Sequence, residues 1–253
     1  MSESQNIYDD PAFFAGYKKL REDPASLNEV LEQPALWSLV GESLEGLTVL
    51  DLGCGFGDFA RRARRAGAKS VLGIDISENM LAEARRRTND TGVEFRCADI
   101  AHLVLQNSGF DVVVSSLMLH YVEDYEAAVG KVAGYLRPGG RFVFSVEHPI
   151  FTARVGEDWI RNSDGSVLYW PLDTYRPEGE RRTTWFVDGV VRYHRSIETY
   201  VNGLVDAGFQ LRRLLEPAPA MDAAVTADLD LERRRPPFLL ISATRAPGLD
   251  RPA

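Results

Sequence analysis

Short apolar runs alternate with longer amphipathic segments through most of the chain. The run 110–115 is almost continuously apolar, which is typical of a parallel strand that is buried on both faces. The repeated strand-helix-strand order predicts an α/β fold, in which a doubly wound, mainly parallel, seven-stranded sheet carries helices on both faces. The strands are expected at 48–52, 70–75, 93–97, 110–115, 141–146, 209–214 and 238–244.

Helices are expected between these strands, where apolar residues recur at helical spacing. In the segment 57–66 the apolar residues share one side, and four arginines cover the other. Ser77 is the expected N-cap of a helix over 78–87. Two further helices are expected, one that follows an Asp124 N-cap and ends at Pro138-Gly139-Gly140, and one over 196–207.

Residues 149–195 interrupt this alternation and hold three of the four tryptophans. Asp188-Gly189 is a β-hairpin turn signal between two strand-like pieces. We interpret 149–195 as an inserted cap over the strand ends, within a single domain that spans 1–253. The aromatic side chains of this segment either line a ligand pocket, which typically has apolar walls, or form the small core of the insertion itself. They are Phe151, Trp159, Tyr169, Trp170, Tyr175, Trp185, Phe186 and Tyr193.

Composition limits the classes of partner and compartment. The 253 residues are 45% hydrophobic and 26% charged, which fits one folded α/β domain. No apolar run approaches the roughly 20 residues that cross a bilayer, and residues 1–5 lack a signal-peptide pattern, so we expect a cytoplasmic protein without a membrane partner. Residues 1–5 and 246–253 are expected to be loose ends. The net charge of −8 argues against nucleic acid as a partner, because phosphate recognition depends on Lys and Arg.

Acidic residues occur at or just after three successive predicted strands. Asp51 lies in the first strand, directly before the glycine-rich loop 53–57. An aspartate replaces the third glycine of a dinucleotide-binding loop, and Asp51 would repel a pyrophosphate but suit a cationic ligand. Asp75 follows the second strand, where a carboxylate accepts hydrogen bonds from ribose hydroxyls. Asp99 follows the third strand, where it is suited to accept from an adenine amino group.

From Val49 to Gly140 the sequence resembles the class I S-adenosylmethionine-dependent methyltransferases. The glycine loop is similar to their first motif, Asp75 to their ribose-binding acid and Asp99 to their adenine-binding acid. The segments 110–115 and 136–140 resemble their fourth strand and the turn before their fifth. The resemblance implies a Rossmann-like methyltransferase fold, S-adenosylmethionine as cofactor with S-adenosylhomocysteine as product, and methyl transfer to an oxygen or nitrogen of a small-molecule acceptor. It implies that Gly53, Gly55, Asp75, Ile76, Met80, Asp99, Ile100 and Ser115 line the cofactor, with Tyr17 as a lid tyrosine near its methionine end; Asp51 joins this set through its suitability for a cation.

A hydroxyl acceptor benefits from a general base, usually a histidine or a carboxylate. Three histidines lie near the expected site: His120 after the fourth strand, His148 after the fifth, and His194 at the end of the insertion. These three and Glu147, the neighbour of His148, are the candidate catalytic residues, although each also has a structural interpretation. No histidine pair has metal-ligand spacing, and the two cysteines match no metal or disulfide pattern, so no metal is expected.

Three other functions are weighed against this one. An RNA or protein methyltransferase with the same cofactor is supported by the arginine clusters, of which 85–87 and 233–235 are examples. A protein that binds S-adenosylmethionine without transferring methyl would carry identical binding motifs. An NAD-dependent dehydrogenase is disfavoured by the glycine spacing. The sequence leaves the identity of the acceptor and the oligomeric state open.

Overall fold

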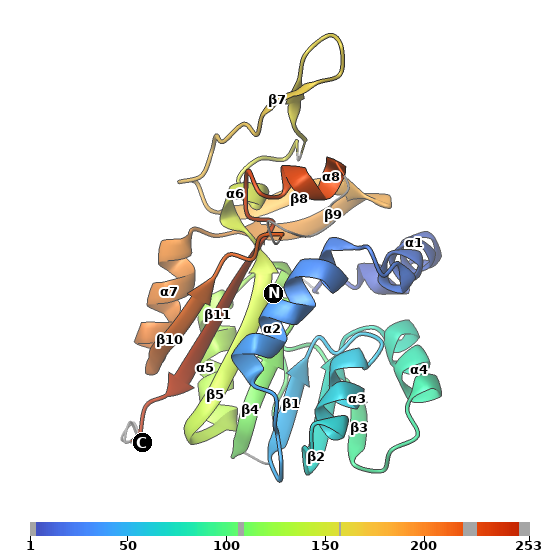
Figure 1. The fold of residues 1–253 in the computed structure, drawn as a ribbon. Coiled ribbons are helices and arrows are strands. Elements are labelled where there is room, and N and C mark those ends of the chain that lie inside the picture. The colour runs from blue at the N-terminus through green and yellow to red at the C-terminus, as the bar shows by residue number, and fades with distance from the viewer. Residues whose placement is uncertain (1–3, 106–108, 157, 220–226, 248–253) are drawn as a thin grey trace.

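The computed structural model describes residues 4–105, 109–156, 158–219 and 227–247. A seven-stranded sheet with helices on both faces forms the body of the protein (Figure 1). Its strand order is β10-β11-β5-β4-β1-β2-β3, so the chain order reverses between β1 and β4. The strands are β1 (Thr48–Leu52), β2 (Ser70–Asp75), β3 (Val93–Cys97), β4 (Phe110–Ser115), β5 (Leu136–Glu147), β10 (Phe209–Leu215) and β11 (Phe238–Arg245).

Pairing in this sheet is parallel except around β11. β1 pairs with β2 and β4, β2 with β3, and β4 with β5, all in parallel. β11 runs antiparallel to both β5 and β10. Val112, Val113 and Val114 of β4 are fully buried, as a central strand covered on both faces requires. The predicted doubly wound, mainly parallel seven-stranded sheet is therefore confirmed.

Helices cover both faces of the sheet, while α1, α6 and α8 lie beyond its strand ends (Figure 1). The helices are α1 (Pro11–Glu22), α2 (Gln33–Val40), α3 (Asp58–Arg65), α4 (Glu78–Arg87), α5 (Tyr125–Tyr135), α6 (Pro149–Thr152), α7 (Ile197–Asp206) and α8 (Ala227–Leu231), with the short turns η1 (Ile7–Asp9), η2 (Asn28–Glu32) and η3 (Leu119–Tyr121). α2 and α3 contribute Leu36 and Phe59 to the core on one face. α5 and α7 contribute Val129 and Tyr200 to the core on the other. Ser77 accepts a hydrogen bond from the backbone N–H of Met80, so the predicted cap of α4 is confirmed.

The helix that Asp124 caps ends earlier than predicted. The Asp124 side chain accepts from a backbone N–H as expected, but α5 stops at Tyr135, so the prediction that it runs to Pro138-Gly139-Gly140 is wrong. Leu136 already has extended backbone, is fully buried and pairs with Phe110 of β4. The Pro-Gly-Gly stretch lies inside β5, where the pairing with β4 shifts register. Because Leu136 is buried in the core as extended backbone, the helix ends before it reaches the proline and glycines that were expected to end it.

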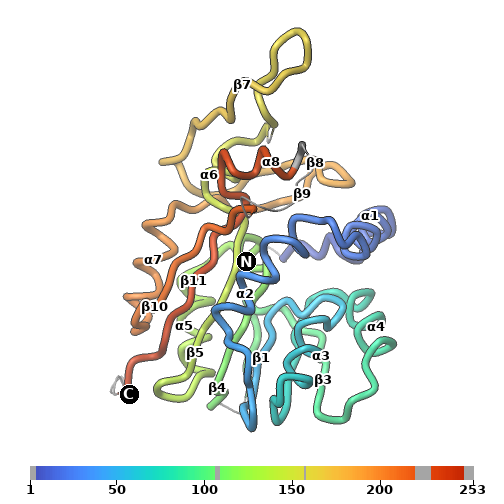
Figure 2. Tube along the Cα trace, viewed as in Figure 1, coloured from blue at the N-terminus to red at the C-terminus, as the bar shows by residue number. Residues whose placement is uncertain are grey.

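The insertion forms α6 and two antiparallel hairpins beyond the carboxyl end of β5 (Figures 1 and 2). The hairpins consist of β6 (Ile160–Arg161) with β7 (Val167–Tyr169), and β8 (Gly179–Trp185) with β9 (Val187–His194). The second hairpin turns at Phe186, whose φ is +60°, and not at Asp188-Gly189 as predicted. The Asp188 carboxylate instead accepts a hydrogen bond from Thr184. The ring of Phe186 packs edge-on against Phe13 of α1, so a tertiary contact places this turn.

The described end residues are bound to the body of the protein. Ser4 Oγ donates a hydrogen bond to the Asp99 carboxylate, and Gln5 bonds to backbone groups of β9. Near the other end, the backbone N–H of Ala246 donates to the carbonyl of Gly208, which lies between α7 and β10. The prediction that these residues are loose is wrong, because long-range partners hold them. The outermost residues of that prediction lie outside the described part of the chain.

The aromatic core behind β5 gives a test of this packing. Phe144 is fully buried, with its ring centroid 5.0 Å from that of Phe142. We expect Phe144→Ala to lower the free energy of unfolding by about 3–5 kcal/mol, because a large cavity remains. Leu211→Ala, at a side chain 41% exposed on β10, is the control and should cost less than about 1 kcal/mol. Urea titrations measure both; similar losses in the two variants would contradict this account of the core.

Candidate functional site

The loop between β1 and α3 brings bare backbone to the edge of the sheet. Gly53, Gly55 and Gly57 have φ values of +75°, +50° and +72°, which residues with side chains rarely adopt. A Cβ added at Gly53 would lie 2.6 Å from the Met118 side chain. The loop therefore requires glycine for its conformation and, at Gly53, for its packing.

Asp51 is a buried carboxyl directly before this loop. It is 1% exposed, and its Oδ2 has no hydrogen-bond partner within the described chain. Burial, followed by the charges of Asp75 and Asp58, raises the pKa of Asp51 to about 8. A carboxyl in this state gains from a positively charged ligand, which would restore its ionised form.

Asp75 ends β2 and is held by backbone donors. Its two carboxylate oxygens accept from Gly55 N at 2.8 Å and from Ser77 N at 2.9 Å. Burial raises the pKa of Asp75 to about 6, although these hydrogen bonds oppose the rise. The carboxylate is thus fixed in orientation before any ligand binds.

Asp99 follows β3 and is bonded to the N-terminal segment. Its carboxylate accepts from Ser4 Oγ at 2.7 Å and from Ala101 N at 2.8 Å, and lies 3.0 Å from His102 Nδ1. Burial raises the pKa of Asp99, but these hydrogen bonds outweigh burial and hold the pKa below its ordinary value. The Ser4 hydroxyl occupies a position at which a ligand donor would compete for the same carboxylate.

These groups border a cavity of about 1060 Å³. It extends from the glycine loop past Tyr121 to Glu178, Arg195 and Thr199, where β8, β9 and α7 meet. Most of the predicted cofactor-binding residues line it, namely Tyr17, Gly53, Gly55, Asp75, Ile76, Met80, Asp99 and Ile100. Asp51 and Ser115 do not line it; both are buried at the ends of β1 and β4. The structure thus gathers residues from the loop and three strand ends around one space.

Three tyrosines form an aromatic wall of this cavity. Tyr8 packs edge-on against Tyr17, with ring centroids 5.0 Å apart, and its hydroxyl lies 3.4 Å from that of Tyr121. Burial is the main cause that raises the pKa of all three phenols, so they stay protonated and neutral. Tyr8 and Tyr121 were not expected from the sequence. Tyr8 lies in a turn without a motif, and Tyr121 directly follows His120, which is the candidate base at this strand end.

His194 and His148 are each bonded through both ring nitrogens. His194 Nε2 donates to a backbone carbonyl at 2.9 Å, and its Nδ1 lies 2.8 Å from Thr152 Oγ1. His148 Nε2 lies 2.8 Å from Glu216, and its Nδ1 accepts from Ile150 N. Burial lowers the pKa of both histidines. Neither ring lines the described cavity, so the structure places them in the framework of the cap.

His120 and Glu147 lie together behind the cavity wall. Glu147 N donates to His120 Nδ1 at 3.5 Å, and the Glu147 carboxylate is 3.1 Å from Arg192. Burial, followed by the charges of Arg192 and Arg195, holds the pKa of His120 well below its ordinary value. The His120 ring packs on Tyr121 at 4.4 Å between centroids. Among the described lining residues, Tyr121 belongs to the cavity and the predicted catalytic residues His120 and Glu147 do not.

The cap aromatics divide into two groups. Phe151 and Trp170 stack at 5.6 Å, and the Arg235 guanidinium lies 4.0 Å from the Trp170 ring centroid. This group forms a small core within the cap, as the second interpretation of the sequence held. Trp185 instead packs edge-on against Tyr17 at 6.0 Å, so the β8–β9 hairpin supports the cavity's aromatic wall.

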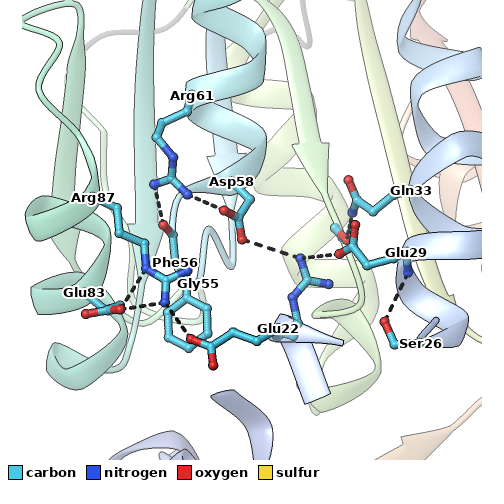
Figure 3. A network of polar contacts seen from close by, with 12 residues as sticks. Glu22, Ser26, Glu29, Gln33, Gly55, Phe56, Asp58, Arg61, Glu83 and Arg87 are labelled. Carbon is cyan, nitrogen blue, oxygen red and sulfur yellow. Dashed lines mark hydrogen bonds and ion pairs between the residues drawn. The ribbon is translucent and has the colours of Figure 1, made fainter. Parts of the chain in front are cut away.

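Ion pairs hold α1, which carries the predicted lid tyrosine, against α3 and α4 (Figure 3). Arg87 of α4 contacts Glu83 at 2.6 Å and Glu22 of α1 at 3.4 Å. Arg21 of α1 reaches Asp58 of α3 at 3.6 Å. Because exposed ion pairs contribute only about 0–1 kcal/mol each, this network orients α1 more than it stabilises the fold.

Within the residues that the structure describes, no helix is both long and apolar enough to span a membrane. In the same residues, no three His, Cys, Asp or Glu side chains are grouped to hold a metal ion.

Residues 50–144 match a family model described as a methyltransferase domain.

Three known proteins resemble the chain over most of its length. A protein from Haemophilus influenzae, described as uncharacterized, is 35% identical and is matched over 97% of this chain and 99% of its own length. The structure of a putative S-adenosylmethionine-dependent methyltransferase from Listeria monocytogenes shares 41% identity over 85% of this chain and 96% of its own, with a TM-score of 0.80. An S-adenosylmethionine-dependent methyltransferase from Mesorhizobium loti shares 44% identity over 87% and 99%, with a TM-score of 0.79.

The buried carboxyl of Asp51 gives folding a pH dependence of defined sign. Its pKa of about 8 in the folded protein exceeds the ordinary value of 3.8. The stability that the protonated carboxyl contributes to the folded protein is therefore fully present below pH 3.8. That stability is lost as the pH rises through about 8. Without ligands, we expect Asp51→Asn to melt above the wild type near pH 8, and the difference to shrink toward pH 4.

Melting temperatures of both proteins across this pH range test the prediction. Asp90→Asn is the control, because the pKa of its carboxyl is lowered by an ion pair with Arg64 at the surface. A melting difference between Asp51→Asn and wild type that stays constant with pH would contradict the prediction.

Proposed function

Since the chain belongs to the S-adenosylmethionine-dependent methyltransferases, we propose that it transfers the cofactor's methyl group to an oxygen or nitrogen atom of a small-molecule acceptor. The size of the cavity is the observation that carries this proposal. At about 1060 Å³ it exceeds slightly the roughly 300–1,000 Å³ of sites that hold one drug-sized ligand. The space suits the cofactor together with a compact acceptor.

The residues near the glycine loop fit the cofactor. Asp75 presents a pre-oriented carboxylate to the cavity, which suits a ribose with two hydroxyl donors. The Asp51 carboxyl lies outside the cavity lining, but its Oδ2 is buried without a partner in the described chain, and its ionised form would attract the ammonium group of a bound amino acid moiety. When bound, the cofactor supplies a methyl group that is already activated on a positively charged sulfur.

The remaining task of the protein is to position the acceptor and exclude water. The buried phenols of Tyr8, Tyr17 and Tyr121 provide a neutral wall with hydroxyl donors. Glu178 and Arg195 bring polar groups from the cap end to the far side of the cavity. We therefore propose that segment 149–195 covers the acceptor pocket through its second hairpin, and that His120 and Glu147 position Tyr121.

Charge on the cavity wall supports a neutral or cationic acceptor over a phosphate-bearing one. Acidic lining residues outnumber basic ones, with Asp75, Asp99, Glu123, Asp124, Glu126 and Glu178 against Lys131 and Arg195. The Lys131 ammonium donates to the backbone carbonyl of Ile100, and Arg195 to that of Glu123. Both cations are thus engaged by the protein itself.

The arginine clusters that favoured RNA are largely paired. Arg64 contacts Asp90, Arg87 contacts Glu83, and Arg235 contacts Glu232. A guanidinium paired with a carboxylate is a weaker phosphate ligand, because binding would require exchange of one anion for another. This pairing supports a small molecule over an RNA acceptor.

Cofactor binding is the first test. We expect Asp75→Ala to weaken S-adenosylmethionine binding by about 1.5–3 kcal/mol, because a charged hydrogen-bond acceptor is lost. Asp90→Ala removes a comparable carboxylate far from the cavity and is the matched control. Calorimetry measures both, and NAD binding tighter than S-adenosylmethionine binding would refute the cofactor assignment.

Methyl transfer is the second test. We expect release of S-adenosylhomocysteine with at least one member of a panel of small phenols, hydroxy acids and primary amines, and none with transfer RNA or denatured protein. Mass spectrometry of the products identifies the methylated atom. A protein that binds S-adenosylmethionine tightly but methylates no small molecule would refute the proposed function and leave the family intact.

A further inference from the structure

A fully buried carboxylate lies behind the cavity wall. Glu32 ends the π-helical turn η2 and is 0% exposed. It forms no salt bridge within the described part of the chain, since the nearby Arg21 makes its ion pairs with Glu29 and Asp58. Burial of a carboxylate without a direct cation destabilises the folded protein, and π-helical turns occur frequently at functional sites. The position is therefore expensive for a group that serves packing alone.

Hydroxyl and amide donors surround this carboxylate. Ser116 Oγ donates to Glu32 Oε1 at 2.9 Å, and Ser145 Oγ donates to the same oxygen. Gln33 Nε2 donates to Oε2 at 2.8 Å. Three hydrogen-bonding side chains thus hold the carboxylate at a fixed point between η2, β4 and β5.

Ser116 connects Glu32 to the cavity. It follows β4 and lines the cavity together with Leu117 and Met118. Met118 packs against Gly53, so this wall adjoins the glycine loop. A serine hydroxyl has one proton and two lone pairs, and here the proton points to Glu32. A lone pair remains for a donor on the cavity side, although Gln33 approaches Oγ at 3.4 Å.

We propose that Ser116 and Glu32 form a proton relay, and that the acceptor is a hydroxyl compound whose proton this relay removes. The inference rests on the proposed function, which it narrows from oxygen or nitrogen to an O–H group. Ser116 is the catalytic residue that touches the acceptor, and Glu32 acts through it.

The step balances in atoms and charge. The acceptor oxygen forms a bond to the methyl carbon, whose former bonding pair stays on the sulfur. The acceptor proton passes to Ser116 Oγ, while the proton of Ser116 passes to Glu32 Oε1. One positive charge on sulfur and one negative charge on the carboxylate disappear together, and the products are an ether, a thioether and a carboxylic acid.

Electrostatics around Glu32 favour its role as a base. Burial raises the pKa of Glu32, although the hydrogen bonds from Ser145, Ser116 and Gln33 and the charge of Arg21 on α1 oppose the rise. Burial and, to a smaller extent, the negative charge of Glu32 raise the pKa of Tyr17 on α1, so this phenol remains neutral. A carboxylate with a raised pKa takes up a proton more readily at neutral pH than an ordinary glutamate does.

A purely structural Glu32 and a Glu32 that accepts a proton through Ser116 predict different effects of substitution. Ser145 allows the two roles to be distinguished. Ser145 bonds to the same carboxylate oxygen as Ser116, but it does not line the described cavity. Loss of either hydroxyl removes one hydrogen bond from Glu32, whereas only loss of Ser116 breaks the path to the acceptor. Ser145→Ala is therefore the matched control for Ser116→Ala.

The charge of Glu32 is testable without an acceptor. Carbon-13 NMR of glutamate-labelled protein with bound S-adenosylhomocysteine, with Glu32→Gln to assign the signal, should show a carboxylate at about pH 8 that takes up a proton above the ordinary range of glutamate. A Glu32 that is still protonated at about pH 8 cannot accept a proton, and this result would overturn the relay. This measurement decides the charge state even if the proposed function fails.

Turnover tests the path. With the hydroxyl acceptor found in the panel, Glu32→Gln and Ser116→Ala should each lower kcat on the order of a hundredfold, with unchanged S-adenosylmethionine affinity. Ser145→Ala should change kcat only a few fold. Wild-type kcat should rise with pH through the pKa of Glu32, and Glu32→Gln should lose this dependence, while Glu32→Asp retains part of it. Equal losses in the two serine variants with an unaltered pH profile would show that Glu32 is structural, and methylation confined to amines would refute the hydroxyl acceptor.

Discussion

The site depends on acidity that the fold confines at the carboxyl ends of β1 and β2. Asp51 is buried and Asp75 is half-buried, and the charge of Asp75 helps to raise the pKa of Asp51. The backbone N–H groups of Gly55 and Ser77 donate to Asp75, but Asp51 has an oxygen without a partner in the described chain. Parallel pairing of β1 with β2 makes this arrangement unavoidable, because it brings both strand ends to one edge. If the cofactor binds beside the glycine loop as proposed, its positive charge offsets this repulsion.

The N-terminal residues and the cap are remote from each other in the chain, but they come together over this edge. The N-terminal residues bond to Asp99 through Ser4 and to β9 through Gln5, which joins the sheet domain to the cap across the cavity. Asp9 accepts from Ser77 Oγ and Asn79 N at the start of α4, so the same segment also binds the helix next to the cofactor loop. Residues 4–9 thus form a roof over this edge that is held by hydrogen bonds. A ligand that binds Asp99 would compete with the hydrogen bond from Ser4.

The sequence predicts the sheet well and the roof poorly, for a physical reason. The strands and the glycine loop are local patterns: apolar runs, caps and turns act within a few residues, as Ser77 and the buried valines of β4 show. Ser4 and Asp99 bond across 95 positions, and Gln5 reaches Val191 across 186, so no local pattern encodes them. The hairpin turn at Phe186 has the same origin, since its ring packs on α1. For the same reason Tyr8, Tyr121 and Glu32, which no motif marks, are brought to the cavity or behind its wall only by tertiary structure.

The histidines were singled out by their nearness to strand ends, but chain position does not determine access. His194 and His148 use both ring nitrogens in the framework, and His120 is buried near two arginines that disfavour its protonation. The charge balance of methyl transfer favours a carboxylate base instead. Transfer of a methyl group from a sulfonium to a neutral acceptor removes a positive charge, and an acid-rich cavity opposes that loss because its carboxylates stabilise the cation of the ground state. The opposition falls if one carboxylate becomes neutral in the same step. Proton uptake by Glu32 through Ser116 does so at fixed geometry, whereas a His120 base would end the step as a third cation beside Arg192 and Arg195.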